Sequence, residues 1–190
     1  MSRLVIRSTR DGSTPVVDTR DADEIARRLA ERGVEFARWT PATRPPSNGA
    51  RLSKDEILAS YAPGVAALAE RGYATVDVIS VTPTPDPQWP ERARSMREKF
   101  RDEHTHAEDE VRFFAWGRGL FYLRLDEDVV HLVLCEAGDL LSVPAGTRHW
   151  FDMGSEPRFS AIRFFTNPEG WVGKFTDDPI ARRFPSLDEL

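Results

Sequence analysis

The chain has 190 residues, a formal net charge of −5 and a single cysteine, Cys135. This length suits one domain that buries about 70% of the surface of its unfolded chain. The mild, evenly spread charge gives no reason to expect nucleic acid or an anionic membrane as a partner, and one cysteine excludes an internal disulfide. The sequence shows no signal peptide and no apolar run of membrane-spanning length, so we expect a cytoplasmic protein.

Helices in the first 100 residues are predicted from capping signals. Asp21 or Asp23 can cap a helix that ends at Gly33. Ser53 and Glu56 form a capping box at the start of a second helix. The expected helices cover residues 21–33, 53–72 with a kink or restart at Pro63, and 91–100.

Strands in the same half are predicted from short apolar or alternating runs, at residues 4–6, 34–39 and 75–81. Turn residues 11–13 close the first strand. We expect a loop over residues 41–49, and an exposed connector over residues 82–90, which hold four prolines.

From residue 111 onward the sequence predicts short strands, at residues 111–116, 120–125, 129–135, 140–143, 149–151 and 160–165. Gly117 and Gly119 predict a turn between the first two of them, and residues 126–128 predict a hairpin loop. Near-even spacing of short strands is typical of a barrel or sandwich. We therefore expect a mainly β fold, a small barrel with a few peripheral helices in the N-terminal half.

Two histidines begin the stretch with the densest chemistry. His104 and His106 are one residue apart, so alternation along an extended strand places them on one side. Glu110 and Arg112 share that parity, although an intervening turn could reset it. Two imidazoles and a carboxylate on one face suit a first-row divalent metal. The alternative is a solvated histidine-rich turn.

A third histidine follows a second patterned stretch. Residues 139–143 predict a strand, and Pro144 with Gly146 predicts a turn at its end. His149 then opens an apolar run in which an imidazole needs a polar partner. This spacing raises the case for a bound metal.

Both stretches resemble the paired motifs of the cupin superfamily, which are small jelly-roll barrels. Six residues separate Glu110 from Gly117, as that pattern requires. Glu108 competes with Glu110 as a ligand on chemistry alone, and the spacing favours Glu110. Two positions depart from the pattern: Glu98 stands where the first motif has glycine, and Met153 where the second often has asparagine.

A narrower resemblance, to the bacterial acireductone dioxygenases of methionine salvage, covers nearly the whole chain, and Met153 fits it. It rests on the segments at residues 33–36, 72–73, 77–80, 103–106, 108–114, 140–145, 149–155 and 167–171. The resemblance implies a single cupin domain over residues 1–190, with an N-terminal α/β elaboration at 1–100 and a metal-binding barrel core at 101–175. We expect it to act as a monomer.

The same resemblance implies one Fe(II) or Ni(II) per chain in octahedral coordination. Its ligands would be His104, His106, Glu110 and His149. The substrates would be dioxygen and 1,2-dihydroxy-3-keto-5-methylthiopentene. The iron form would give 4-methylthio-2-oxobutanoate and formate, and the nickel form 3-methylthiopropanoate, formate and carbon monoxide.

Other site residues are expected around these ligands. Arg112 matches the family position that stabilises the substrate oxyanion. Arg163 is a second candidate, and a surface arginine is the alternative reading. Glu103 and Asp109 flank ligands and could orient them for catalysis, unless they are simply solvated acids.

Phe100, Phe151 and Trp171 are expected to line an apolar pocket for the thioether, although aromatic residues are more often plain core. His131 lies outside both motifs and is expected to be a strand residue. A cupin isomerase or thiol dioxygenase would use the same metal ligands with a different pocket. A non-enzymatic barrel that binds a sugar or effector would need no catalytic arginine beside Glu110.

Overall fold

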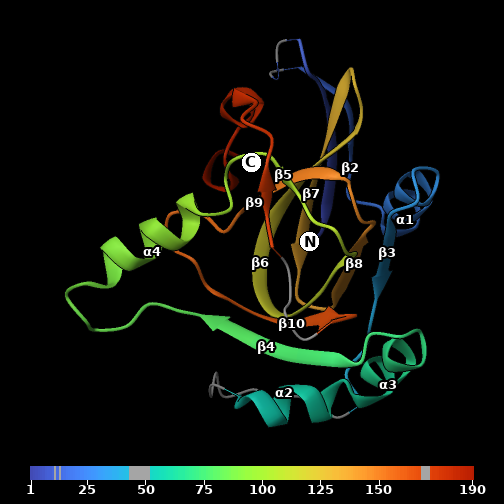
Figure 1. Cartoon of the computed structure of the whole chain (residues 1–190), viewed down its shortest axis with the longest axis vertical. Coiled ribbons are helices and arrows are strands. Elements are labelled where there is room, and N and C mark those ends of the chain that lie inside the picture. The colour runs from blue at the N-terminus through green and yellow to red at the C-terminus, as the bar shows by residue number, and fades with distance from the viewer. Residues whose placement is uncertain (11, 13, 43–51, 168–171) are drawn as a thin grey trace.

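The computed structural model describes residues 1–10, 12, 14–42, 52–167 and 172–190. Within these ranges the chain is mostly β, and its strands join into one continuous sheet that curls round on itself (Figure 1). The expected mainly β barrel with peripheral helices is confirmed. No helix in the described ranges has the length and apolar character needed to cross a membrane.

The strands divide into two paths that share one member, and every pairing between described strands is antiparallel. The paths are β11-β5-β9-β6-β7-β1-β2 and β4-β10-β6-β8-β3. In chain order the strands are β1 (Arg3–Ser8), β2 (Pro15–Thr19), β3 (Glu35–Arg38), β4 (Thr75–Val81), β5 (His104–Thr105), β6 (Glu110–Asp126), β7 (Val129–Glu136), β8 (Asp139–Val143), β9 (Arg148–Asp152), β10 (Phe159–Phe165) and β11 (Lys174–Phe175).

Strand β6 is the shared member, and it corrects the prediction of a turn at Gly117 and Gly119. Its first half pairs with β8 and β10, and its second half pairs with β7 and β9. Gly117 has a φ of 76°, and a Cβ there would lie 1.9 Å from the carbonyl oxygen of Arg158. The glycine therefore marks a close backbone approach at which the strand passes from one path to the other.

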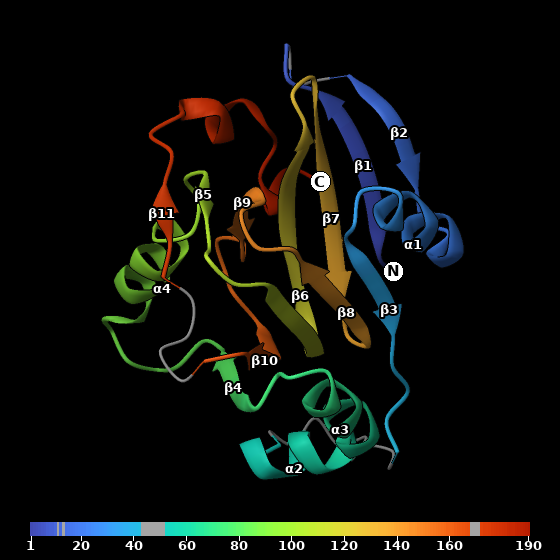
Figure 2. The same ribbon diagram turned by 45° about the vertical axis from the view of Figure 1, so that its right-hand side comes forward.

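The helices cover the outside of the sheet, with α1 beside β1 and β3 (Figure 2). The capping predictions are confirmed: Asp21 accepts from the backbone N–H of Glu24, and Ser53 with Glu56 forms a complete capping box. A new helix starts beside Pro63, as expected. The helices are α1 (Ala22–Ala30), α2 (Lys54–Ser60), α3 (Ala62–Glu70) and α4 (Trp89–Glu98), with 3-10 helices η1 (Pro179–Arg183) and η2 (Leu187–Glu189).

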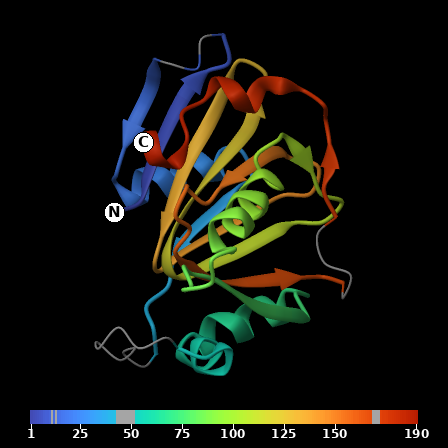
Figure 3. The same ribbon diagram turned by 90° about the vertical axis from the view of Figure 1, so that its left-hand side faces the viewer.

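Figure 3 shows α4 lying across the side of the barrel, and α2 and α3 beneath β4. The first hundred residues contribute three strands that pair with later ones, because β1 pairs with β7, β3 with β8 and β4 with β10. Strand β2 was not predicted. Of the expected loop over residues 41–49, residues 43–49 lie outside the described part of the chain.

One cluster of buried apolar residues fills the inside of the barrel. Another lies on the outer face of the sheet, on β1, β6, β7 and β9. Cys135 is fully buried inside the barrel, as expected, and burial raises the pKa of its thiol. On the outer face Tyr122 and Trp150 stack with ring centroids 4.9 Å apart, beneath the C-terminal residues Ile180 and Phe184. The C-terminal segment thus covers an aromatic face that would otherwise meet water.

Candidate metal centre

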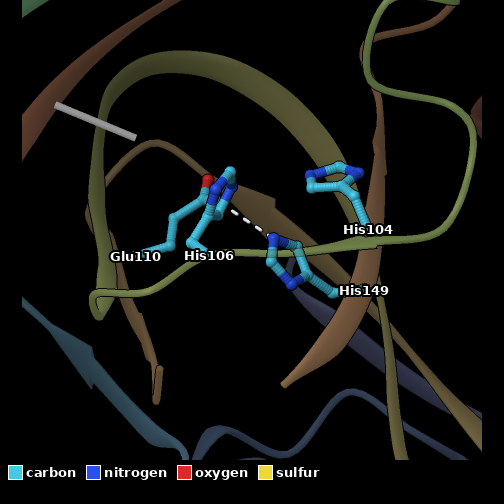
Figure 4. A group of neighbouring side chains, drawn as sticks. All are labelled: His104, His106, Glu110 and His149. Atoms are coloured by element: carbon cyan, nitrogen blue, oxygen red, sulfur yellow. Dashed lines mark hydrogen bonds and ion pairs between the residues drawn. The ribbon is translucent and has the colours of Figure 1, made fainter. Parts of the chain in front are cut away.

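Four buried side chains meet at one end of the barrel, and Figure 4 shows them turned toward one another. They are His104, His106, Glu110 and His149, each at most 6% exposed. One ligand atom from each lies within 4.8 Å of the others. The structure therefore brings together all four predicted ligands.

Strand pairing explains this convergence. His104 lies directly opposite His149 in the register of β5 with β9. Residues 107–109 form a turn that separates β5 from β6, so Glu110 opens a new strand. The backbone N–H of Gly146 donates to the carbonyl of His106 at 2.9 Å, which holds the turn before β9 against the first histidine pair.

The tautomer of each imidazole is fixed by a backbone carbonyl. A carbonyl oxygen only accepts, so each Nδ1 carries its proton and each Nε2 presents a lone pair to the centre. The Nε2 atoms of His149 and His106 then lie 3.0 and 3.2 Å from Oε2 of Glu110, which also only accepts. A cation among these acceptors satisfies them, so the donor set fits a divalent metal. The carbonyls belong to Asp102, Val172 and Thr147, at 2.8, 3.0 and 2.8 Å from Nδ1 of His104, His106 and His149.

Charge at the centre is distributed unevenly. Burial, followed by the neighbouring His149, lowers the pKa of His104 to about 4, so this imidazole is neutral at neutral pH. Burial favours the neutral form of Glu110, but the charge of Arg112 and the close contacts with His106 and His149 outweigh it and hold the pKa of that carboxyl well below its usual range. A neutral imidazole and an ionised carboxylate are the forms that bind metal.

Arg112 sits directly beside this centre. Its Nη2 lies 2.8 Å from Oε1 of Glu110, and the side chain is 10% exposed. The guanidinium lies over two aromatic rings, with its carbon 4.7 Å from the centroid of Phe151 and 5.2 Å from that of Phe121. A buried cation held by one carboxylate and two rings has little freedom, and Arg112 lines the same cavity as the four donors.

A cavity of about 520 Å³ opens onto the four donors. Phe100 and Phe151 line it, as predicted, whereas Trp171 lies outside the described residues. Arg163 also lines the cavity. It is only half buried, and Asp77 binds its guanidinium through two contacts of 2.8 and 2.5 Å, so it is more constrained than a free surface arginine.

Glu103 and Asp109 point to different places. Glu103 is buried and accepts from the Thr176 hydroxyl at 2.7 Å and from Arg124 at 3.3 Å, so it is not a solvated acid. Asp109 accepts from the Tyr73 hydroxyl at 2.8 Å and from a backbone N–H in the turn before His149 at 2.9 Å. Neither carboxylate is among the lining residues of the cavity. Asp109 can thus act on His149 through that turn.

Two other residues considered as candidates, Glu108 and His131, do not belong to the group of four donors. Glu108 accepts from the Thr166 hydroxyl at 2.8 Å and is not among the four grouped donors. His131 is buried in β7, opposite Ile6 and Leu123.

Sequence reasoning missed several residues that line the cavity. Phe165 follows Arg163 at the alternate position on β10, so period-two parity could have indicated it. Lys99 and Phe175 gave no such signal. The missed lining residues are Thr75, Asp77, Lys99, Phe165, Val172, Gly173 and Phe175.

Comparison with known proteins assigns the chain to a family. The model of the ARD/ARD′ family matches residues 65–173, which is more than half of the chain. The chain belongs to the ARD/ARD′ family. This confirms the resemblance that the motifs indicated, and membership of a dioxygenase family makes the chain an oxidoreductase.

Relatives in this family match over the full chain. An acireductone dioxygenase from Hahella chejuensis is 53% identical, with 100% of this chain and 98% of the relative covered. One from Pseudomonas aeruginosa is 52% identical, with both chains fully covered. Among solved structures, an acireductone dioxygenase from Bacillus anthracis that holds a cadmium ion in its active centre has a TM-score of 0.77 and 31% identity, over 92% of this chain and 98% of that one.

Proposed function

We propose that the chain uses dioxygen to cleave 1,2-dihydroxy-3-keto-5-methylthiopentene in methionine salvage. The observation that carries this proposal is the set of four buried donors beside Arg112, at the base of a cavity with an aromatic lining. Fe(II) or Ni(II) would be held by His104, His106, Glu110 and His149. The named relatives support the same reaction class.

Each part of the cavity suits one part of this substrate. A bound Fe(II) or Ni(II) would supply Lewis-acid charge and, with four protein ligands on an octahedral ion, two positions for substrate oxygens. Arg112 is placed to stabilise the negative charge of the ionised acireductone, and Arg163 to bind the same anion from β10. Phe100 and Phe151 offer the apolar surface that a thioether chain requires.

Arg112 also argues for an enzyme over a binding protein. A barrel that merely binds an effector has no need of a cation held at 2.8 Å from the metal-ligating carboxylate. Burying a guanidinium is costly unless it is paired. Here its partner is Glu110, which would also bind the metal. An arginine in that position would stabilise negative charge that develops on the substrate, which a binding protein does not require.

The test is to strip the protein of metal and reload it separately with Fe(II) and Ni(II). With the acireductone under air, both forms should consume oxygen. The iron form should release formate and 4-methylthio-2-oxobutanoate, and the nickel form should also release carbon monoxide. His106→Ala protein treated identically is the control and should consume none enzymatically. Absence of oxygen uptake by both metal forms would refute the proposed function.

A further inference from the structure

Asp152 is the acidic residue of the motif at residues 149–155, and it has no role in the proposed reaction. It ends β9 directly after Phe151, and its side chain is fully buried. Four N–H groups contact its carboxylate: Nε and Nη2 of Arg97 at 2.6 and 2.9 Å, and the backbone N–H groups of Gly154 and Leu187 at 3.0 and 2.9 Å. A buried carboxylate with this many donors is fixed in position.

Arg97, the side chain that pairs with Asp152, belongs to α4. The guanidinium grips Asp152 with both arms of its planar fork, which a lysine could not do. Ala93 is the only buried residue of α4, and Trp89 and Met96 pack against the core while partly exposed, so the apolar attachment of the helix to the barrel is limited. The Arg97–Asp152 ion pair adds a polar attachment between α4 and β9, on the side of the barrel where Figure 3 shows the helix.

The Arg97–Asp152 pair lies one helical turn from the cavity. The backbone N–H of Phe100 donates to the carbonyl of Arg97 at 3.3 Å, and the carbonyl of Phe100 accepts from the N–H of Phe151 at 2.9 Å. Phe100 and Phe151 are both cavity walls. Phe100 lies two residues beyond the end of α4. Its spacing from Phe151 is thus constrained by two links, the Phe151–Phe100 hydrogen bond and the Arg97–Asp152 pair.

We infer that Arg97 and Asp152 form a positioning pair that sets the separation of the Phe100 and Phe151 walls. This separation would determine which length of substrate side chain the cavity accepts. The inference rests on the proposed function, because the ligand is an acireductone. Neither residue of the pair lines the cavity, so the effect passes through the two phenylalanines. We expect the main effect on binding of the substrate's side chain, because the backbone carbonyls that hold His104, His106 and His149 belong to residues other than Arg97 and Asp152.

The test compares two acireductones, one with the methylthioethyl chain and one with a methyl group in its place. In Arg97→Met, kcat/KM for the methylthioethyl substrate should fall about tenfold, mainly through KM, because apolar contacts worth one or two methylene groups are lost. Turnover of the methyl substrate should stay within about twofold of wild type, because it never reaches the wall. Arg94→Met, on the same helix in an exposed ion pair with Glu91, should match wild type with both substrates.

A second measurement does not depend on turnover. Hydrogen exchange at the Phe151 amide should speed up in Arg97→Met and stay unchanged in Arg94→Met, because only the first loosens the bond to Phe100. If Arg97→Met fails to fold, Arg97→Lys keeps the charge, loses the fork and should show the same pattern more weakly. An equal response of both substrates, or an unchanged Phe151 amide, would overturn the positioning role. Wild-type protein inactive on both substrates would instead refute the proposed function, and the exchange measurement would still decide the positioning role.

Discussion

Glu110 accepts from Arg112 through one oxygen and faces two metal-binding imidazoles with the other. The same carboxylate would therefore bind the metal and hold Arg112, the cation that we propose stabilises the substrate. Removing Arg112 or His106, which contact different oxygens of Glu110, separates these two tasks, since His106 is a proposed metal ligand and Arg112 is not. Two variants test the separation.

Arg112→Leu should keep its metal, because a guanidinium is not a ligand. Turnover should fall by a factor equivalent to about 2–4 kcal/mol, the usual loss when one charge-stabilising donor is removed. Metal analysis and oxygen uptake on the same sample measure the two effects. Arg92→Leu, an exposed arginine paired with Asp86, is the control. Wild-type turnover by Arg112→Leu would show that the role given to this residue is wrong.

His106→Ala should lose its metal, because one of four donors disappears and Glu110 loses an imidazole partner. His131→Ala should retain one metal per chain, since that histidine lies in β7, among apolar partners away from the centre. Elemental analysis after gel filtration measures both. A metal-replete His106→Ala protein would exclude the proposed ligand set.

At the scale of elements, β6 sets the geometry of the barrel, and its bend depends on Gly117. Gly117→Ala places a Cβ against the Arg158 carbonyl at 1.9 Å and also strains a φ of 76°. Gly72→Ala shares the positive φ, at 99°, but meets nothing within 4 Å. Gly72→Ala should cost about 1–3 kcal/mol, the backbone strain alone, and Gly117→Ala clearly more. Urea unfolding of both measures the difference, and equal losses would show that the close approach is unimportant.

Sequence patterns predicted those elements whose signals are local. The cap at Asp21 and the capping box at Ser53 depend on residues three apart, and both form as expected. The continuity of β6 could not be predicted, because Gly117 reads equally as a turn or as a bend, and only the pairing with β10 decides. Strand β2 was missed because it is a largely exposed edge strand without a clear apolar alternation.

At the candidate site too, residues with local sequence signals could be predicted, and contacts between distant residues could not. Three of the four proposed ligands, His104, His106 and Glu110, share a parity, and His149 stands in a second spaced motif, so all four could be found. The orientation of Glu103 could not, because its partners Arg124 and Thr176 are distant in the sequence. The carbonyl of Val172, which fixes the tautomer of His106, is a backbone group that no residue pattern reveals.

At the scale of the whole molecule, His131 makes stability depend on pH. Burial lowers its pKa below the ordinary value, so the unfolded chain takes up a proton first, at a pH of about 6.5. Stability is therefore highest above that pH and falls as the pH drops toward the folded pKa, by at most about 1.4 kcal/mol per pH unit from this group. His131→Leu removes the group.

The measurement is the free energy of unfolding of both proteins between about pH 7.5 and 5.5. Groups common to both cancel in the difference, so wild type should lose more stability than His131→Leu on the acid side. Parallel curves would show that His131 titrates normally in the folded protein.

The four donors sit on elements of very different extent, and this has a kinetic consequence. Glu110 opens a strand of 17 residues, whereas His104 lies in a strand of two and His106 in the loop that follows it. Long strands with many paired residues open mainly when the whole molecule unfolds, whereas a two-residue strand with few pairings can open locally. An ion should thus leave and enter through the histidine pair while Glu110 stays in place. The folded protein would then exchange one metal for another, and the ion bound at the proposed site would follow the current metal supply more than the supply when the chain folded.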